Sequence, residues 1–236
     1  MLQFLGRGSA FADTQNCAFF EADGALILLD CPMSAFHRLR YMQKRFDRIA
    51  VLVTHTHSDH IGGIPMLIHF AKHVLHIPVT VIAPTQEVAD DLRYLIERLD
   101  GCSPDAYAML TADALRADWF VSAVPVKHAE ALAGRCFGYV LRIGGRDVIY
   151  TGDTASLSPF LPYLHAGAYL YTEAAGFDSG VHLYIEDLLP EIRRLTAEGV
   201  HVYLMHLDDE AALAARIQGT GAEFAPLYTE KTGGNA

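Results

Sequence analysis

The sequence predicts an α/β fold in which two mixed β-sheets pack face to face and helices cover both outer faces. Short apolar runs typical of strands occur in both halves of the chain, and runs with helical spacing follow them in each half. The composition of the 236 residues shifts at no point that would mark a domain boundary, so we expect a single domain over residues 1–236. With 51% hydrophobic and 19% charged residues, the chain is neither disordered nor fibrous.

The first half of the chain alternates expected strands and helices. Turn signals such as Asp23-Gly24 separate its apolar runs. We expect strands over residues 2–5, 17–21, 25–30, 49–54 and 79–83. Apolar residues one helical turn apart predict helices over residues 34–46, 60–74 and 84–99.

The second half shows the same mixture without repeating the sequence. A tight Gly144-Gly145 turn joins two of its expected strands. The strands are expected over residues 119–127, 137–143, 147–150, 168–171 and 200–205. Helices are expected over residues 185–198 and 208–218, and the polar, glycine-rich tail 229–236 is expected to fray.

Charge, cysteine content and hydropathy limit the environment and the partners. The net charge of −10 repels phosphate backbones, so we expect no extended nucleic-acid surface. We expect neither a signal peptide nor a membrane segment, because no basic region precedes an apolar core and no apolar run approaches about 20 residues. The cysteines form no CxxC pair and are expected to be buried free thiols of a cytoplasmic protein. They are Cys17, Cys31, Cys102 and Cys136.

A dense cluster of metal-binding side chains follows the expected strand over residues 49–54. The segment reads Thr-His-Thr-His-Ser-Asp-His and supplies four candidate ligands, which are His55, His57, Asp59 and His60. In an extended loop, residues two apart point the same way, so His55 and His57 face a common point. Imidazole and carboxylate ligands together suit zinc, iron or manganese rather than calcium.

Three further candidate ligands also stand where expected strands end. His128 follows the strand over residues 119–127, Asp153 follows the strand over residues 147–150, and His206 follows the strand over residues 200–205. Strand ends that feed loops are where α/β scaffolds place functional side chains. We therefore expect all seven candidate ligands to meet at one site.

The pattern HxHxDH, followed by a separated His, Asp and His, resembles the signature of the metallo-β-lactamase superfamily. The resemblance covers nearly the whole chain and implies an αββα sandwich with a two-metal site at one edge of the sheets. It implies that one divalent ion takes His55, His57 and His128. It also implies that a second ion takes Asp59, His60 and His206, with Asp153 bridging the two. Zinc is the expected metal, with manganese or iron also possible for this ligand set.

Two metal ions held about 3.5–4 Å apart lower the pKa of a shared water toward about 7, which supplies a hydroxide nucleophile at neutral pH. The ions also neutralise negative charge on the reacting centre, so an acidic protein can hydrolyse an anionic substrate. In this interpretation the Asp59 carboxylate also orients the nucleophilic water.

Within the superfamily, three stretches are similar to ribonuclease Z-like proteins. They are the glycine-rich segment 5–10, the segment 172–175 that contains Glu173, and the segment 180–183 that contains His182. The resemblance implies that His182 is a general acid that protonates the leaving oxygen and that Glu173 orients it. The chain departs from the pattern after His182, where Leu183-Tyr184 replaces the usual small residues.

The expected substrate is a small or cyclic phosphodiester, such as a cyclic nucleotide or a short oligonucleotide. The chain lacks the long basic arm with which transfer-RNA 3′-processing enzymes grip RNA, so ribonuclease Z activity is the weaker hypothesis. A lactonase or thioesterase that uses the same metals is a rival hypothesis, and so is a metal-stabilised binding domain without turnover. The resemblance also implies a homodimer.

Several histidines lie outside this pattern. Among them, His69 and His73 lie four residues apart in an expected helix. This spacing suits a surface metal ion, but a polar helix face next to a loop explains it equally well.

Overall fold

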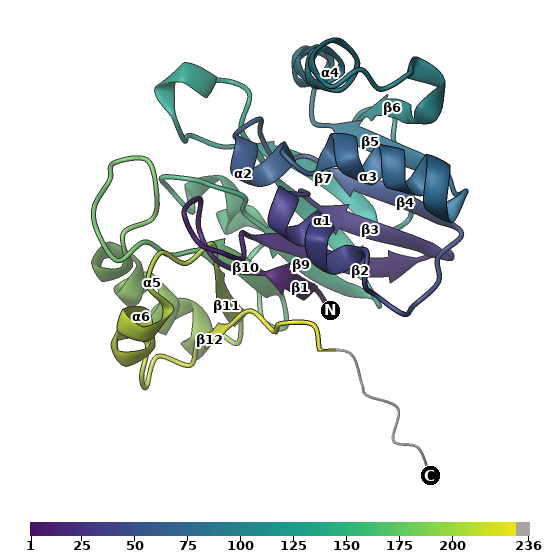
Figure 1. The fold of residues 1–236 in the computed structure, drawn as a ribbon. Helices are drawn as coiled ribbons and strands as arrows, with labels where there is room; N and C mark the ends of the chain where they lie inside the picture. Colours follow the sequence, from purple (N-terminus) through teal and green to yellow (C-terminus); the bar gives the residue numbers. More distant parts are fainter. Residues whose placement is uncertain (230–236) are drawn as a thin grey trace.

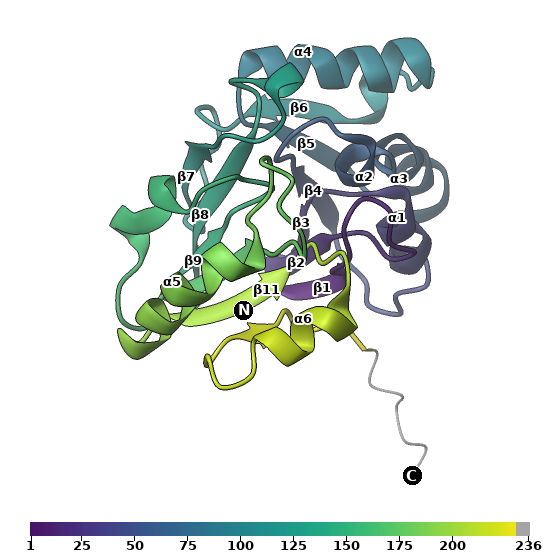
Figure 2. The ribbon, with the colours of Figure 1, turned by 90° about the vertical axis from the view of Figure 1, so that its left-hand side faces the viewer.

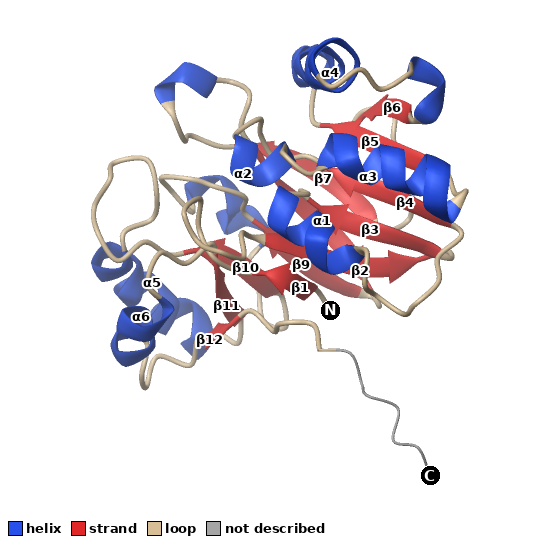
Figure 3. Cartoon of the chain, viewed as in Figure 1, coloured by secondary structure: helices blue, strands red, loops and turns tan. Residues whose placement is uncertain are grey.

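The computed structural model describes residues 1–229, and within them two six-stranded sheets form the centre of the molecule (Figures 1 and 3). This arrangement confirms the predicted αββα sandwich. The strands of the first sheet are β1 (Gln3–Gly6), β2 (Cys17–Ala22), β3 (Ala25–Leu29), β4 (Arg48–Leu52), β5 (Val79–Ala83) and β6 (Ala108–Thr111). The strands of the second sheet are β7 (Phe120–Pro125), β8 (Phe137–Ile143), β9 (Arg146–Tyr150), β10 (Tyr169–Glu173), β11 (His201–Met205) and β12 (Glu223–Phe224).

Both sheets follow the same plan. The first two strand pairs of each sheet, β1–β2–β3 and β7–β8–β9, are antiparallel. The next three pairs, β3–β4–β5–β6 and β9–β10–β11–β12, are parallel. Parallel strands end at the same edge of their sheet. The loops that follow β4, β9 and β11 therefore leave the sandwich where their side chains can meet.

Helices cover the outer faces of the two sheets (Figures 1 and 2). The outer face of the first sheet carries α1 (Met33–Leu39), α3 (Ile64–Phe70) and α4 (Gln86–Arg93), with the short α2 (Ser58–Ile61) before α3. The outer face of the second sheet carries α5 (Ile185–Ala197) and α6 (Glu210–Arg216). π-Helical turns extend α3 over Ala71–Leu75 and α4 over Tyr94–Leu99. Short 3₁₀ turns cover Pro104–Ala106, Glu130–Leu132 and Ser158–Tyr163.

The layer between the sheets is filled by large side chains from both of them. Phe4 from the first sheet stacks on Tyr171 from the second, with ring centroids 5.6 Å apart. Tyr139 is fully buried in the same layer, and its hydroxyl donates a hydrogen bond of 2.5 Å to the Val53 carbonyl oxygen. This bond ties the second sheet to the end of β4, directly before the histidine-rich loop.

Two predicted helices differ from the expected ones, one in length and one in continuity. The helix expected over residues 34–46 ends at Leu39, and Met42 and Phe46 pack against the core from the non-helical chain beyond it. The helix expected over residues 60–74 is interrupted at Gly62-Gly63. A Cβ atom on Gly63 would lie 2.5 Å from the Pro32 carbonyl oxygen, so the backbone approach at this break requires glycine.

Two short edge strands, β6 and β12, have four and two residues and no recognisable pattern in the sequence. The remaining strands and helices lie within a few residues of their predicted bounds. All four cysteines are buried and free, as predicted. No helix within residues 1–229 combines the length and apolar character that crossing a membrane requires. Of the tail expected to fray, residues 230–236 lie outside the described part of the chain.

Candidate metal centre and active site

The predicted ligands of the histidine-rich loop lie at the carboxyl end of β4. His55 and His57 stand in the extended segment before α2, whereas Asp59 and His60 lie in the first turn of that helix. His57 has extended backbone angles, with φ −65° and ψ 147°, so it forms the boundary between the strand-like segment and the helix. Because the backbone changes conformation at His57, the pair His55 and His57 and the pair Asp59 and His60 face two neighbouring positions.

The loop contributes to two groups of side chains, each completed by one histidine from the second sheet. In the first group, His55 Nε2 lies 3.1 Å and His128 Nε2 lies 3.3 Å from His57 Nδ1. In the second group, His60 Nε2 lies 3.3 Å and His206 Nε2 lies 3.4 Å from Asp59 Oδ2. Each group offers three ligand atoms close enough to hold one metal ion.

Asp153 lies between the two groups. Its Oδ2 is 3.8 Å from His128 Nε2 and 3.4 Å from His206 Nε2, and its Oδ1 is 3.4 Å from His60 Nε2. One carboxylate therefore approaches ligand atoms of both groups. The structure thus brings all seven predicted ligands together, from the loops after β4, β7, β9 and β11.

The chemistry of this cluster fits divalent metal ions. His60 Nε2 and Asp153 Oδ1 are buried without a hydrogen-bond partner in the described chain, and a buried polar atom without a partner costs free energy. Both atoms point into the cluster, where they lie 3.4 Å apart. A divalent cation would satisfy both, and the metallo-β-lactamase fold implies such ions. Histidine nitrogens and carboxylate oxygens are suitable donors for zinc and other transition metals.

Outer partners set the tautomers of the ligand rings. His60 Nδ1 donates to Asp30 Oδ2 at 2.8 Å, His128 Nδ1 donates to the Val181 carbonyl oxygen at 3.0 Å, and His55 Nδ1 lies 3.0 Å from Thr54 Oγ1. A proton on each Nδ1 leaves Nε2, the atom that faces the cluster, with a free lone pair. Carboxylate and carbonyl partners of this kind orient histidine ligands in metal sites.

The pKa values of three imidazoles favour the form that binds metal. Burial lowers the pKa of His55, His57 and His128 below the usual value, and neighbouring imidazoles lower it further. At neutral pH these rings are therefore uncharged. Metal binding requires a neutral imidazole, so the first group is prepared for an ion without losing a proton.

Asp30 is a buried residue beside the candidate ligands that the sequence pattern did not reveal. It is fully buried after β3 in a left-handed conformation with φ 63°. Besides His60, its carboxylate accepts hydrogen bonds of 2.8 Å from the backbone N–H and the hydroxyl of Thr54. The one signal in the sequence was an aspartate at the end of an otherwise apolar strand.

Replacing Asp30 with Asn is expected to lower the metal affinity of the second group about 10- to 100-fold, because loss of an outer partner typically costs that much. The amide nitrogen of Asn cannot accept the proton of His60 Nδ1 or of Thr54. Metal affinity measured by competition with a fluorescent chelator checks this result. Asp23→Asn is the matched control, because Asp23 also has positive φ but lies in a surface turn outside the cluster. Equal affinities in the two variants would contradict the role of Asp30.

Gly152 fixes the loop that carries Asp153. It has φ 60°, and a Cβ atom there would lie 2.7 Å from the Phe137 carbonyl oxygen and 3.1 Å from the side chain of Thr54. Both the conformation and the close approach therefore require glycine. The loop after β9 is held in this way against the loop after β4.

Gly152→Ala is expected to destabilise the fold by about 2–5 kcal/mol, since a left-handed alanine costs about 1–2 kcal/mol and overpacking adds about 1–3 kcal/mol. Chemical denaturation measures the free energy of unfolding. Gly144→Ala is the control, because Gly144 has φ 59° but no neighbouring atom within 4 Å of its added Cβ. If the free energy of unfolding falls by the same amount in both variants, the close approach at Gly152 does not contribute to the effect of the substitution.

The predicted pair of Glu173 and His182 lies beside the metal ligands. His182 Nδ1 and Glu173 Oε2 are 2.5 Å apart, and the backbone N–H of Thr154 donates to Glu173 Oε1. Burial, and after it the Asp153 carboxylate, raises the pKa of Glu173 well above its usual value. The Glu173 carboxylate accepts a hydrogen bond from the N–H at His182 Nδ1. The His182 ring lies 4.8 Å from the ring of His128 and 5.4 Å from that of His206.

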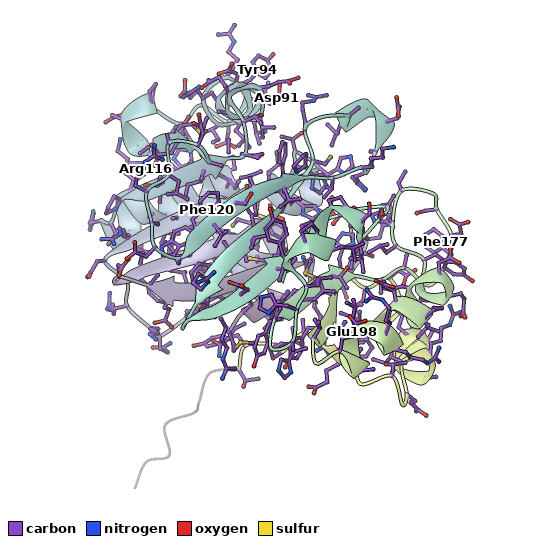
Figure 4. The ribbon with its side chains drawn as sticks, turned by 180° about the vertical axis from the view of Figure 1, so that it is seen from behind. Asp91, Tyr94, Arg116, Phe120, Phe177 and Glu198 are labelled. Atoms are coloured by element: carbon purple, nitrogen blue, oxygen red, sulfur yellow. The ribbon has the colours of Figure 1, made fainter. Side chains whose placement is uncertain are left out.

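A small cavity of about 100 Å³ opens next to this pair. Its walls include His182, His206 and two exposed aromatic side chains, Phe11 and Phe177. Phe177 projects from the loop between β10 and α5 (Figure 4). Ser9 and Ala10 from the glycine-rich segment also line the cavity, whereas Arg7 is bound to Glu210 and to the Ala225 carbonyl oxygen.

Comparison with known proteins matches this chain to one protein family. The family model of Anti-Pycsar protein Apyc1 matches residues 1–225. A protein of that name from Bacillus phage 010DV004 is 27% identical over 235 residues, and the match covers 88% of this chain and 89% of the phage protein.

Two solved structures share the fold. The metallo-β-lactamase fold protein YhfI from Bacillus subtilis has a TM-score of 0.73 and 16% identity, and the match covers 97% of both chains. A diphosphatase of the PhnP family has a TM-score of 0.71 and 19% identity, and the match covers 97% of this chain and 95% of that chain. These similarities confirm the predicted fold.

Proposed function

The chain belongs to the family of Anti-Pycsar protein Apyc1 and is a metal-dependent hydrolase, and we propose that it hydrolyses a small cyclic phosphodiester, specifically a cyclic nucleotide. The observation that carries this proposal is the hydrogen-bonded pair of His182 and Glu173 at the edge of the metal-ligand cluster. A cyclic nucleotide matches the parts of the site in turn: a phosphodiester for the metals, an alkoxide leaving group for His182, and a base for the aromatic walls.

The seven side chains would hold two divalent metal ions, and zinc is the metal that we expect first. One ion would take His55, His57 and His128. The other would take Asp59, His60 and His206, with Asp153 between them. When bound, the ions would lower the pKa of a water molecule and neutralise the charge of the phosphate.

His182 would supply the proton that the leaving oxygen requires. Its Nδ1 is engaged by Glu173, so Nε2 is the atom that is free to donate. An alkoxide is a poor leaving group, and an imidazolium is well suited to protonate it near neutral pH. Glu173 would keep the ring in one orientation and one tautomer. Asp59 would orient the attacking water in addition to binding metal.

The cavity walls would hold the nucleoside part of the substrate. Phe11 and Phe177 are large, exposed and close to the proton donor, and aromatic side chains provide stacking surfaces for any base. The net charge of −10 would disfavour long nucleic acids. A small substrate avoids this cost because it meets mainly the cationic centre.

Phe177→Ala is expected to raise KM for a cyclic nucleotide about tenfold or more, since base stacking is worth about 1–3 kcal/mol. The kcat value should change little, because Phe177 is not among the groups that move protons. Steady-state kinetics separates the two constants. Tyr94→Ala is the control: Tyr94 is 60% exposed, as Phe177 is, but lies by α4 (Figure 4). An unchanged KM in Phe177→Ala would remove the stacking role.

A panel of substrates tests the proposed function. The metal-loaded protein is assayed on 3′,5′-cyclic nucleotides, bis(p-nitrophenyl) phosphate, a lactone and a thioester. We expect the highest kcat/KM on a cyclic nucleotide, with a nucleoside monophosphate as product. Dominant turnover of the lactone or thioester would overturn the proposal and make the chain a carboxyl-ester hydrolase on the same ligands.

A further inference from the structure

A second cluster of metal-binding side chains lies outside the active site, in the helical layer over the first sheet. It consists of His69 on α3 and of Asp100 and Cys102, which follow the π-helical turn at the end of α4. One ligand atom from each residue lies within 4.8 Å of the other two. None of the three belongs to the ligand set of the active site.

The distances within this cluster match the spacing of ligand atoms around a tetrahedral zinc ion. Cys102 Sγ lies 3.3 Å from His69 Nε2 and 3.7 Å from Asp100 Oδ2, and His69 Nε2 lies 3.3 Å from Asp100 Oδ2. Zinc bonds of about 2.3 Å to sulfur and about 2.0–2.2 Å to nitrogen and oxygen place tetrahedral ligand atoms about 3.3–3.6 Å apart. The three atoms therefore form one face of a tetrahedron of the correct size.

The backbone fixes the two ligands on the loop. The N–H of Asp100 donates to the Leu95 carbonyl oxygen at 3.0 Å, and the N–H of Cys102 donates to the Ile96 carbonyl oxygen at 2.9 Å. Between the two ligands, Gly101 has φ 77° with open space around it. This left-handed residue, which favours glycine, turns the chain so that both side chains face His69.

We propose that His69, Asp100 and Cys102 bind a structural zinc ion that joins α3 to the end of the α4 segment. A thiolate with an imidazole and a carboxylate selects zinc over calcium or magnesium. The side chains of His69 and Asp100 are 38% and 37% exposed, so solvent can deliver the ion and fill its fourth position. Cys102 is 2% exposed, and thiolate ligation replaces its proton with the metal.

Burial, and after it the Asp100 carboxylate, raises the pKa of the Cys102 thiol to about 11. Without a cation, the thiol therefore keeps its proton and lies between a carboxylate and an imidazole. A divalent ion would reverse this preference, because a coordinating thiol is deprotonated outright.

Cobalt replacement tests the site separately from the active site. Cobalt(II) bound to a thiolate gives a charge-transfer absorption band in the near ultraviolet, and the seven active-site ligands include no cysteine. The purified chain is loaded with cobalt under a phosphine reductant, which does not compete as a thiol. We expect the band in the wild-type chain, its loss in Cys102→Ser, and its retention in the control Cys136→Ser, which alters another buried free thiol.

Metal analysis and a second variant complete the test. Cys102→Ser is expected to hold one zinc fewer per chain than Cys136→Ser, with a lower unfolding temperature and unchanged turnover of the hydrolase substrate. If Cys102→Ser fails to fold, the surface variant His69→Gln takes its place. We expect His69→Gln to weaken cobalt binding at least tenfold, as measured by titration of the same absorption band. Absence of the band in the wild-type chain, or its persistence in both variants, would overturn the site and leave only a His69–Asp100 ion pair.

Discussion

Replacing Asp153 with Asn is expected to lower kcat/KM on a cyclic nucleotide by about 10³-fold or more. Loss of an outer partner of a metal site costs about 10- to 100-fold, and Asp153 approaches the ligand atoms of both groups directly. An asparagine offers a neutral oxygen where two cations would share a negative charge. Both metal affinity and the positioning of the ions relative to each other should suffer.

The kinetics are measured together with the metal content of the variant. Asp147→Asn is the matched control, because Asp147 lies on β9, shortly before Asp153, and is bound instead to Arg142 and His165. We expect the control to retain its metal and nearly all of its activity. Full metal content and wild-type turnover in Asp153→Asn would refute the bridging role.

Replacing His182 with Ala is expected to reduce kcat on a cyclic nucleotide about 10²- to 10⁴-fold, the usual contribution of a general acid. The same variant should lose far less on bis(p-nitrophenyl) phosphate, since p-nitrophenolate leaves without needing a proton. The metal content should stay unchanged, because His182 is not in either proposed ligand set. The ratio of the two losses therefore measures proton donation rather than general damage.

His165→Ala is the control for this comparison, because His165 is exposed and pairs with Asp147. Equal losses of His182→Ala on both substrates would show that the side chain only supports the structure of the site. Glu173→Gln should produce the same substrate dependence in weaker form, since Glu173 acts through the orientation of His182.

The positions of the seven candidate ligands could be predicted because each follows a strand whose end is visible in the sequence. An apolar run such as that before His55 ends abruptly at a polar residue, and parallel strands bring such ends to one edge. The pairing of Glu173 with His182 came instead from a family resemblance. Local periodicity carries no information about which side chain lies next to which loop.

The features that local patterns did not reveal depend on contacts distant in the sequence. Asp30 contacts His60, 30 residues away, and Cys102 contacts His69, 33 residues away. The spacing of His69 and His73 fitted a surface metal ion no better than a polar helix face, and in the structure the cluster around His69 is completed by Asp100 and Cys102, not by His73. The need for glycine at the helix break likewise depends on a distant contact, because Gly63 lies against the backbone of Pro32.

The most direct test of metal-dependent cyclic nucleotide hydrolysis is the turnover of a 3′,5′-cyclic nucleotide by protein purified without added metal, then stripped with a chelator and reloaded. The metal ions are counted in the Cys102→Ser variant, so that only ions of the active site contribute to the count. We expect about two metal ions per chain in this variant. In the wild-type chain we expect turnover to be lost on stripping and to return with zinc or manganese. Turnover that survives complete removal of metal, or a fully loaded protein that leaves cyclic nucleotides intact, would contradict this function.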